Sequence, residues 1–161
     1  MIPKLGLSEE NRKGVIDVLN TVLADEHVLY TKLRNYHWNV TGPQFHALHE
    51  FFERQYDEVK AIADTVAERT RAHGGFAIGT LNEFLQRTRF QEQPGEYPKA
   101  GTMVANLVAD HEAMVRTLRN DAHLCSETYE DTATEDLLIG LMQTHEEMAW
   151  MLRSFIEGES V

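Results

Sequence analysis

Residues 37–68 read HWNVTGPQFHALHEFFERQYDEVKAIADTVAE, and this stretch decides the fold. Pro43 suits the first position of a helix, and Gly74 with Gly75 suits its end, so a helix is predicted over 43–74. The stretch holds two histidines and three carboxylates with metal-ligand chemistry, namely His37, His49, Glu53, Asp64 and Glu68.

Four of these side chains share one sector of the predicted helix. With His49 at zero and a step of about 100° per residue, Glu53 falls near 40°, Asp64 near 60° and Glu68 near 100°. Fifteen residues separate His49 from Asp64, however, which is roughly 22 Å on a helix, whereas a metal–ligand bond is about 2 Å. A single ion cannot touch both ends of the set.

Pairing the helix with its own copy solves this problem of distance. The pair His49 and Glu68 and the pair Glu53 and Asp64 are both centred between residues 58 and 59. A two-fold axis at that point would bring His49 to Glu68 of the partner subunit and would create two identical sites. His37 can join them, because it lies one turn before the interruption between the two helices at 40–42 and His49 lies about two turns after it.

A solvated charged face is the alternative interpretation of this sector. Glu50 and Lys60 fall in the same sector, so helical phase alone favours the solvated face. The reciprocal placement of two histidines and three carboxylates about one centre favours a metal site. Imidazole with carboxylate suits iron or zinc, and the excess of carboxylates favours iron, with zinc as a substitute.

Helical periodicity covers the remaining chain as well. Ser8 is a good N-cap for a first helix that runs to about Trp38, and Thr80 caps a short helix over 81–85. The stretch 91–101 contains two prolines and two glycines and is predicted to be a loop, and further helices are predicted over 102–125 and 134–156. The prediction is one all-α domain over 1–161: a four-helix bundle whose long crossover between helices two and three carries the short extra helix.

Composition limits the classes of function. The 161 residues carry a formal charge of −11, which opposes general attraction to nucleic acid or an anionic membrane. The single cysteine, Cys125, excludes an internal disulfide, and no apolar run approaches a membrane span. The start, MIPKLGLSEEN, lacks a basic segment followed by an apolar one, so we expect a cytoplasmic protein, nucleoid-associated if it compacts DNA.

These motifs resemble the Dps family, the mini-ferritins named as DNA-binding proteins from starved cells. The resemblance rests on YHWNV-x-G, LHEFFE and D-x-x-A-E-R before a glycine pair, in the spacing H-x11-H-x3-E-x10-D-x3-E. It implies an intersubunit ferroxidase site in which His37, His49 and Glu53 of one subunit meet Asp64 and Glu68 of its two-fold mate. Glu53 departs from the family, which often has Asp there, and its extra methylene affects the spacing between metals.

Two further features gain a meaning from the resemblance. It implies that carboxylates where the third helix turns into the fourth line a three-fold pore for ferrous iron, with Asp136 fitting best among Glu127, Glu130, Asp131, Glu135 and Asp136. The alternative is a solvated turn with acidic capping of a helix. Trp38 is a candidate for an oxidisable residue near the iron, although a core aromatic is the simpler account.

The resemblance implies two functions of different classes. The first is a ferroxidase and iron store, a hollow dodecamer that oxidises Fe(II) with hydrogen peroxide, or with oxygen, and protects against oxidative damage. The second is DNA compaction, which the acidic charge disfavours. DNA binding in the family often rests on a Lys-rich tail, and the residues before Ser8 include only Lys4 as a basic residue. An intrachain di-iron bundle needs Glu-x-x-His pairs, and the chain has none. A purely structural bundle is the remaining alternative.

No role is predicted for the other histidines, which are His27, His46, His73, His111, His123 and His145. The methionines Met142, Met148 and Met151 are expected to fill the core.

Overall fold

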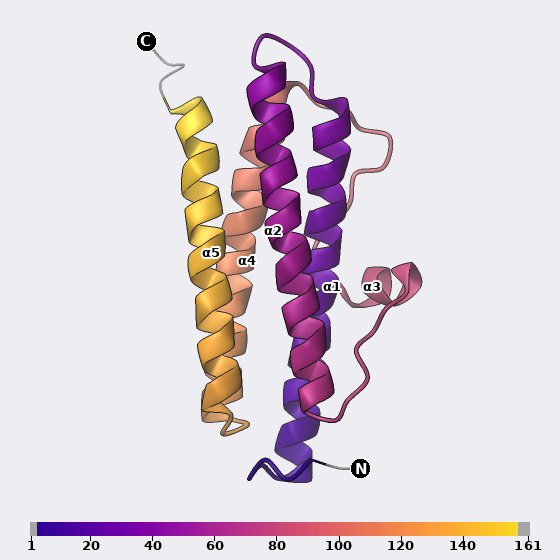
Figure 1. Ribbon diagram of the computed structural model, residues 1–161, viewed down its shortest axis with the longest axis vertical. Coiled ribbons are helices and arrows are strands. Elements are labelled where there is room, and N and C mark those ends of the chain that lie inside the picture. Colours follow the sequence, from indigo (N-terminus) through magenta and orange to yellow (C-terminus); the bar gives the residue numbers. More distant parts are fainter. Residues whose placement is uncertain (1–2, 158–161) are drawn as a thin grey trace.

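Two antiparallel helical hairpins pack side by side in the computed structural model, which describes residues 3–157 (Figure 1). The first hairpin is α1 with α2, and the second is α4 with α5. A long crossover joins the hairpins and carries the short α3 on one side of the bundle (Figure 1). The predicted all-α four-helix bundle, with a short extra helix in the long crossover, is confirmed. The bounds are α1 Glu9–Asn39, α2 Phe45–Ala72, α3 Leu81–Arg87, α4 Ala100–Glu127 and α5 Thr132–Ile156.

The first hairpin turns over residues 40–44. The backbone of Gly42 has φ 112°, a conformation that side chains disfavour, and this lets the chain reverse after α1. Pro43 and Gln44 complete the turn, so α2 begins at Phe45, two residues after its predicted start. At the other end of α1, the side chain of Ser8 accepts a hydrogen bond from the backbone N–H of Asn11 at 3.0 Å, as expected of an N-cap.

The second hairpin is longer at three of its four ends than predicted. Helix α4 begins at Ala100 and ends at Glu127, whereas 102–125 was predicted. Helix α5 begins at Thr132, two residues before the predicted start, because Asp131 and not a later residue caps it. The turn between the helices requires a left-handed backbone at Glu130, with φ 57°.

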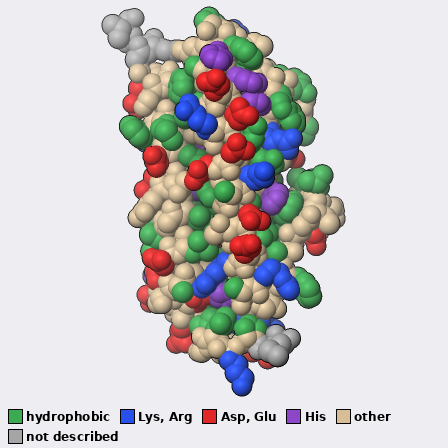
Figure 2. Space-filling view, viewed as in Figure 1, with side chains coloured by type: hydrophobic (Ala, Val, Ile, Leu, Met, Phe, Trp, Pro, Cys, Tyr) green, Lys and Arg blue, Asp and Glu red, His purple; other side chains and the backbone are tan. Residues whose placement is uncertain are grey.

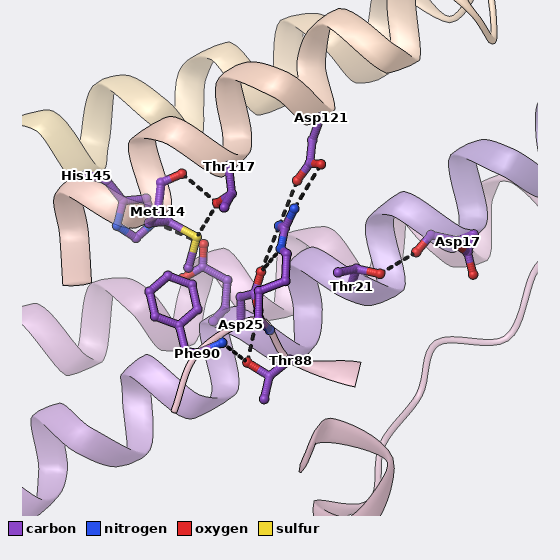
Figure 3. Close-up of polar contacts among 11 residues, drawn as sticks. Asp17, Thr21, Asp25, Thr88, Phe90, Met114, Thr117, Asp121 and His145 are labelled. Atoms are coloured by element: carbon purple, nitrogen blue, oxygen red, sulfur yellow. Dashed lines mark hydrogen bonds and ion pairs between the residues drawn. The ribbon is translucent and has the colours of Figure 1, made fainter. Parts of the chain in front are cut away.

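Salt bridges fasten the crossover to the bundle. The guanidinium of Arg89 donates to Asp25 of α1 at 2.7 Å and to Asp121 of α4 at 2.8 and 3.0 Å. The hydroxyl of Thr88 donates to the same Asp25, so the crossover bridges both hairpins at this point (Figure 3). Upstream, Phe84 of α3 stacks on His27 of α1 with ring centroids 3.9 Å apart.

The core is a continuous apolar layer between the hairpins. Met142 and Met148 are buried and Met151 is half-buried, as expected of core-filling residues. Each large apolar side chain that is fully removed from water contributes about 1.5–3 kcal/mol. The fully buried members include Leu19, Leu23, Leu29, Leu33, Phe52, Leu107, Met114, Leu118, Leu138 and Leu152. None of the helices within residues 3–157 is both long and apolar enough to cross a bilayer.

Candidate metal centre

His37 and His49 meet at the closed end of the first hairpin. Their rings stack with centroids 3.7 Å apart. Nδ1 of His37 lies 2.7 Å from the backbone carbonyl oxygen of His49, and Nδ1 of His49 lies 2.8 Å from that of His37. The structure therefore brings together the two histidines that the sequence placed on either side of the turn.

These reciprocal contacts fix the tautomer of both rings. A carbonyl oxygen can only accept, so each Nδ1 must carry the proton and donate it. Nε2 of each neutral imidazole then keeps its lone pair, which is the arrangement that a metal-binding histidine requires. Two nitrogen donors are thus prepared at one end of the bundle without any carboxylate to orient them.

Glu53 lies one turn beyond His49 on α2 and is exposed. The hydroxyl of Tyr56 donates to the Glu53 carboxylate at 3.3 Å, and the ring of Tyr56 meets His37 edge-on at 5.4 Å. Burial and the neighbouring Glu53 raise the pKa of Tyr56, so its hydroxyl stays protonated as a donor. Tyr56 therefore links the carboxylate to the histidine pair.

Asp64 and Glu68 are exposed further down α2, away from the histidine end. Figure 2 shows this face, with histidines gathered near one end and acidic side chains descending along α2. Within the described part of one subunit, no three His, Cys, Asp or Glu side chains converge on a common metal position. The five predicted ligands therefore do not come together within one chain, and the intersubunit site remains a prediction.

Trp38 does not belong to the core of the subunit. Its side chain is 62% exposed, and the guanidinium of Arg34 lies over its ring at 4.6 Å. The simpler interpretation, a core aromatic, is therefore wrong. A role as a redox neighbour of iron stays a prediction.

The acidic turn between α4 and α5 separates into two kinds of residue. Asp131 is buried and caps α5 by accepting from the backbone N–H of Thr134 at 3.1 Å. Glu127, Glu130 and Asp136 are exposed, and Glu135 is half-buried. The expected acidic capping is confirmed for Asp131, whose carboxylate faces inward. A pore lined by the remaining carboxylates stays a prediction.

Sequence reasoning missed the partner of His73. Its Nε2 lies 2.7 Å from a carboxylate oxygen of Asp131, and Arg69 lies 3.4 Å from the other oxygen. The contact ties the C-terminal end of α2 to the turn of the second hairpin. His73 lies in the last turn of the predicted helix, next to the two glycines that end it, and such a position gives no signal of burial.

A second missed cluster lies in the core itself. Glu26 of α1, His145 of α5 and His111 of α4 are all 0% exposed. Nε2 of His145 lies 3.0 Å from Oε1 of Glu26, and Nδ1 of His145 lies 2.9 Å from Nδ1 of His111. The signal was present, because each of these polar residues occupies an apolar position of its helical period.

Comparisons with known proteins agree with this architecture. Residues 16–160 match the family model described as a ferritin-like domain. An uncharacterized low temperature-induced protein from Nostoc sp. is 47% identical over 157 residues, covering 98% of this chain and 88% of that protein. The DNA protection during starvation protein 2 of Bacillus anthracis is 43% identical over 145 residues, covering 89% of this chain and 97% of that protein.

Solved structures give the same result. The crystal structure of a Dps protein from Bacillus brevis superposes with a TM-score of 0.87 at 36% identity, covering 93% of this chain and 99% of that one. The fold and the family model define a ferritin-like protein. Within that class, the chain belongs to the Dps family. The family is one of iron storage and DNA protection in general.

Proposed function

We propose that this protein is a ferroxidase that oxidises Fe(II) and stores the ferric product inside a hollow dodecamer. The observation that carries the proposal is the reciprocal pair of His37 and His49, each with Nδ1 committed to a carbonyl and Nε2 free. Hydrogen peroxide is the proposed oxidant, with oxygen as the alternative. Zinc fits the same donors and would act as a substitute for iron without being oxidised.

Each proposed ligand has a separate task. His37, His49 and Glu53 would bind Fe(II) from one subunit, while Asp64 and Glu68 would bind from its two-fold mate. The carboxylates offset the charge of the ions, and the neutral imidazoles leave positions open for the oxidant. Tyr56 would hold Glu53 toward the histidine pair through its hydrogen bond.

The electron balance requires two ferrous ions for each peroxide. Each ion gives up one electron, and hydrogen peroxide accepts both, takes up two protons and becomes two waters as its O–O bond breaks. Removing ferrous iron and peroxide together leaves neither reactant for hydroxyl-radical formation. The DNA protection after which relatives are named would follow from this chemistry without contact with DNA.

Mixing of two inactive variants tests whether the site is shared between subunits. His49→Ala and Asp64→Ala are each expected to abolish rapid iron oxidation. Subunits of the two variants assembled together should recover part of the rate, because each mixed interface has one site without both ligands and one intact site. The measurement is the initial rate of Fe(II) oxidation with peroxide, with sedimentation to establish that the assemblies form.

His46→Ala is the matched control, since His46 is an exposed histidine of the same helix and its partner among residues 3–157 is the exposed Glu50, at 3.4 Å. It should oxidise iron at the wild-type rate. No recovery on co-assembly would indicate a site within one chain. A stable monomer that oxidises iron rapidly would also contradict the shared site.

A further inference from the structure

The cluster of Glu26, His145 and His111 is a hydrogen-bonded chain through the centre of the bundle. It begins on α1, passes through α5 and ends on α4, so it connects the first hairpin with the second. All three side chains are 0% exposed. Figure 3 shows the side chain of His145, which reaches from α5 toward the first hairpin.

Unpartnered polar atoms flank this chain at both ends. Oε2 of Glu26 and Nε2 of His111 have no hydrogen-bond partner among the described residues. The same holds for Oε1 of Gln55, whose amide nitrogen donates to the carbonyl of Met148, one turn from His145. Burying such atoms without partners costs free energy, so their presence in the core indicates a task beyond packing.

The geometry does not suit a metal ion. Glu26 contacts Nε2 of His145, whereas His111 contacts Nδ1, and the two nitrogens face different sides of the ring. An ion about 2 Å from its ligands therefore cannot touch all three groups. No cluster within residues 3–157 has the geometry of a metal site with three such ligands.

The geometry suits protons instead. One proton fills the link between Glu26 and His145, and a second fills the link between His145 and His111. Any further proton must go to one of the unpartnered atoms at the ends, where no acceptor from the described residues shares it. Charging both imidazoles would place two adjacent cations in a medium of low dielectric constant.

We propose that Glu26, His145 and His111 form a proton-sensitive latch that holds the two hairpins together and weakens when the surroundings become acidic. His111 stays uncharged in the folded bundle, so the unfolded chain binds a proton at His111 that the folded state does not bind. Acidification then favours separation of the hairpins. The latch is independent of the proposed iron chemistry.

Other charged groups near the latch are already paired. Asp25, the neighbour of Glu26 on α1, and Asp121 of α4 both bind Arg89. Asp110, next to His111 on α4, faces Lys32 of α1 at 2.7 Å. Helix α2 contributes the uncharged Gln55. Among residues 3–157, Glu26 is the one charged group hydrogen-bonded to this pair of imidazoles, and it contacts the pair through His145.

The direction of the pH effect follows from His111. Burial and the neighbouring His145 hold the pKa of His111 well below its usual value. In the unfolded chain the same histidine titrates near about 6.5. Below that pH the unfolded state binds more protons than the folded state, so stability falls as pH falls.

Unfolding by urea at pH 7.5 and 5.5 tests the latch in the full-length assembly. His111→Asn keeps a polar atom near the position of Nδ1 but cannot titrate. Between these pH values the unfolding equilibrium constant of the wild type should rise roughly tenfold more than that of His111→Asn. The control His123→Asn alters an exposed histidine on the same helix and should follow the wild type.

An equal pH dependence in wild type and His111→Asn would overturn the proposal. Should the variant not fold, the nitrogen-15 shifts of the histidine rings in the wild-type assembly at pH 5.5 decide the question. A neutral His111 ring at that pH supports the latch. A charged ring at His111 in the folded protein contradicts it.

Discussion

Asp131 carries opposing electrostatic effects on a single side chain. Burial raises its pKa, but hydrogen bonds from Thr134 and His73 lower the pKa by more, so the net shift is downward. The carboxylate is therefore more stable as an anion in the folded chain than in the unfolded one. Its contribution to stability is present above about pH 4 and is lost as pH falls through the lowered pKa.

Asp131→Ala should lower the free energy of unfolding by about 3 kcal/mol or more. The substitution removes a helix cap and leaves His73 buried without its carboxylate. Urea unfolding at pH 7 measures the loss. Asp136→Ala, on the exposed side of α5, should change stability by less than about 0.5 kcal/mol. Equal losses in the two variants would refute the structural role of Asp131.

The candidate site shows which residue contacts a sequence can disclose. His37 and His49 lie twelve residues apart across a short turn, so spacing alone placed them together. His145 meets Glu26 across 119 residues, and spacing holds no information on which helical stripes face each other at that range. Helical periodicity places these residues on the buried faces of their helices, but it does not show which residues they contact.

At the scale of elements, periodicity predicted every helix and turn chemistry shifted their ends. Pro43 can occupy the first position of a helix, but the chain reverses at Gly42, whose φ is positive, and Pro43 lies in the turn before α2. Capping at Asp131 moved the start of α5 in the other direction. The sequence predicts the crossover as a connection. It does not predict the salt bridges of Arg89, because these depend on contacts with two helices that are distant in the sequence.

Arg89→Met should destabilise the protein by about 3–5 kcal/mol, because Asp25 would remain buried without a counter-charge. Burial already raises the pKa of Asp25, against the lowering by Arg89. Removing Arg89 lets the folded state bind a proton more readily, so the deficit should shrink between pH 7.5 and pH 5. Urea unfolding at both pH values measures it.

Arg87→Met is the matched control in the same crossover. Arg87 pairs with Asp17, whose side chain is 68% exposed, and such pairs contribute about 0–1 kcal/mol. A deficit for Arg89→Met that does not change with pH would contradict the role of Asp25. A small deficit at both pH values would show that the crossover is held by other contacts.

At the scale of the whole molecule, charge sets the relation to DNA. A formal charge of −11 on each chain would be multiplied in the proposed closed assembly, and DNA phosphates would be repelled by it. We expect no retardation of plasmid DNA in a gel at about 0.15 M salt without divalent cations. A clear shift under those conditions would show that a local basic patch, such as the arginines at 69, 71, 87 and 89, overcomes the total charge.

Retardation only with added magnesium would have a different meaning. It would indicate that cations bridge two acidic surfaces, and the proposed iron chemistry would stand. Bovine serum albumin, another acidic protein, is a suitable control for retardation caused by magnesium alone.

The contrast between the histidine pair and the buried latch also sets an order of folding. Bringing together residues 119 apart costs about 2 kcal/mol more in chain entropy than bringing together residues twelve apart. Local contacts therefore form first, and the docking of one hairpin on the other follows. The imidazoles of His37 and His49 can reach their final places on a hairpin that has not yet found its neighbour. Metal donors would then be ready on the newly made chain before the core has closed.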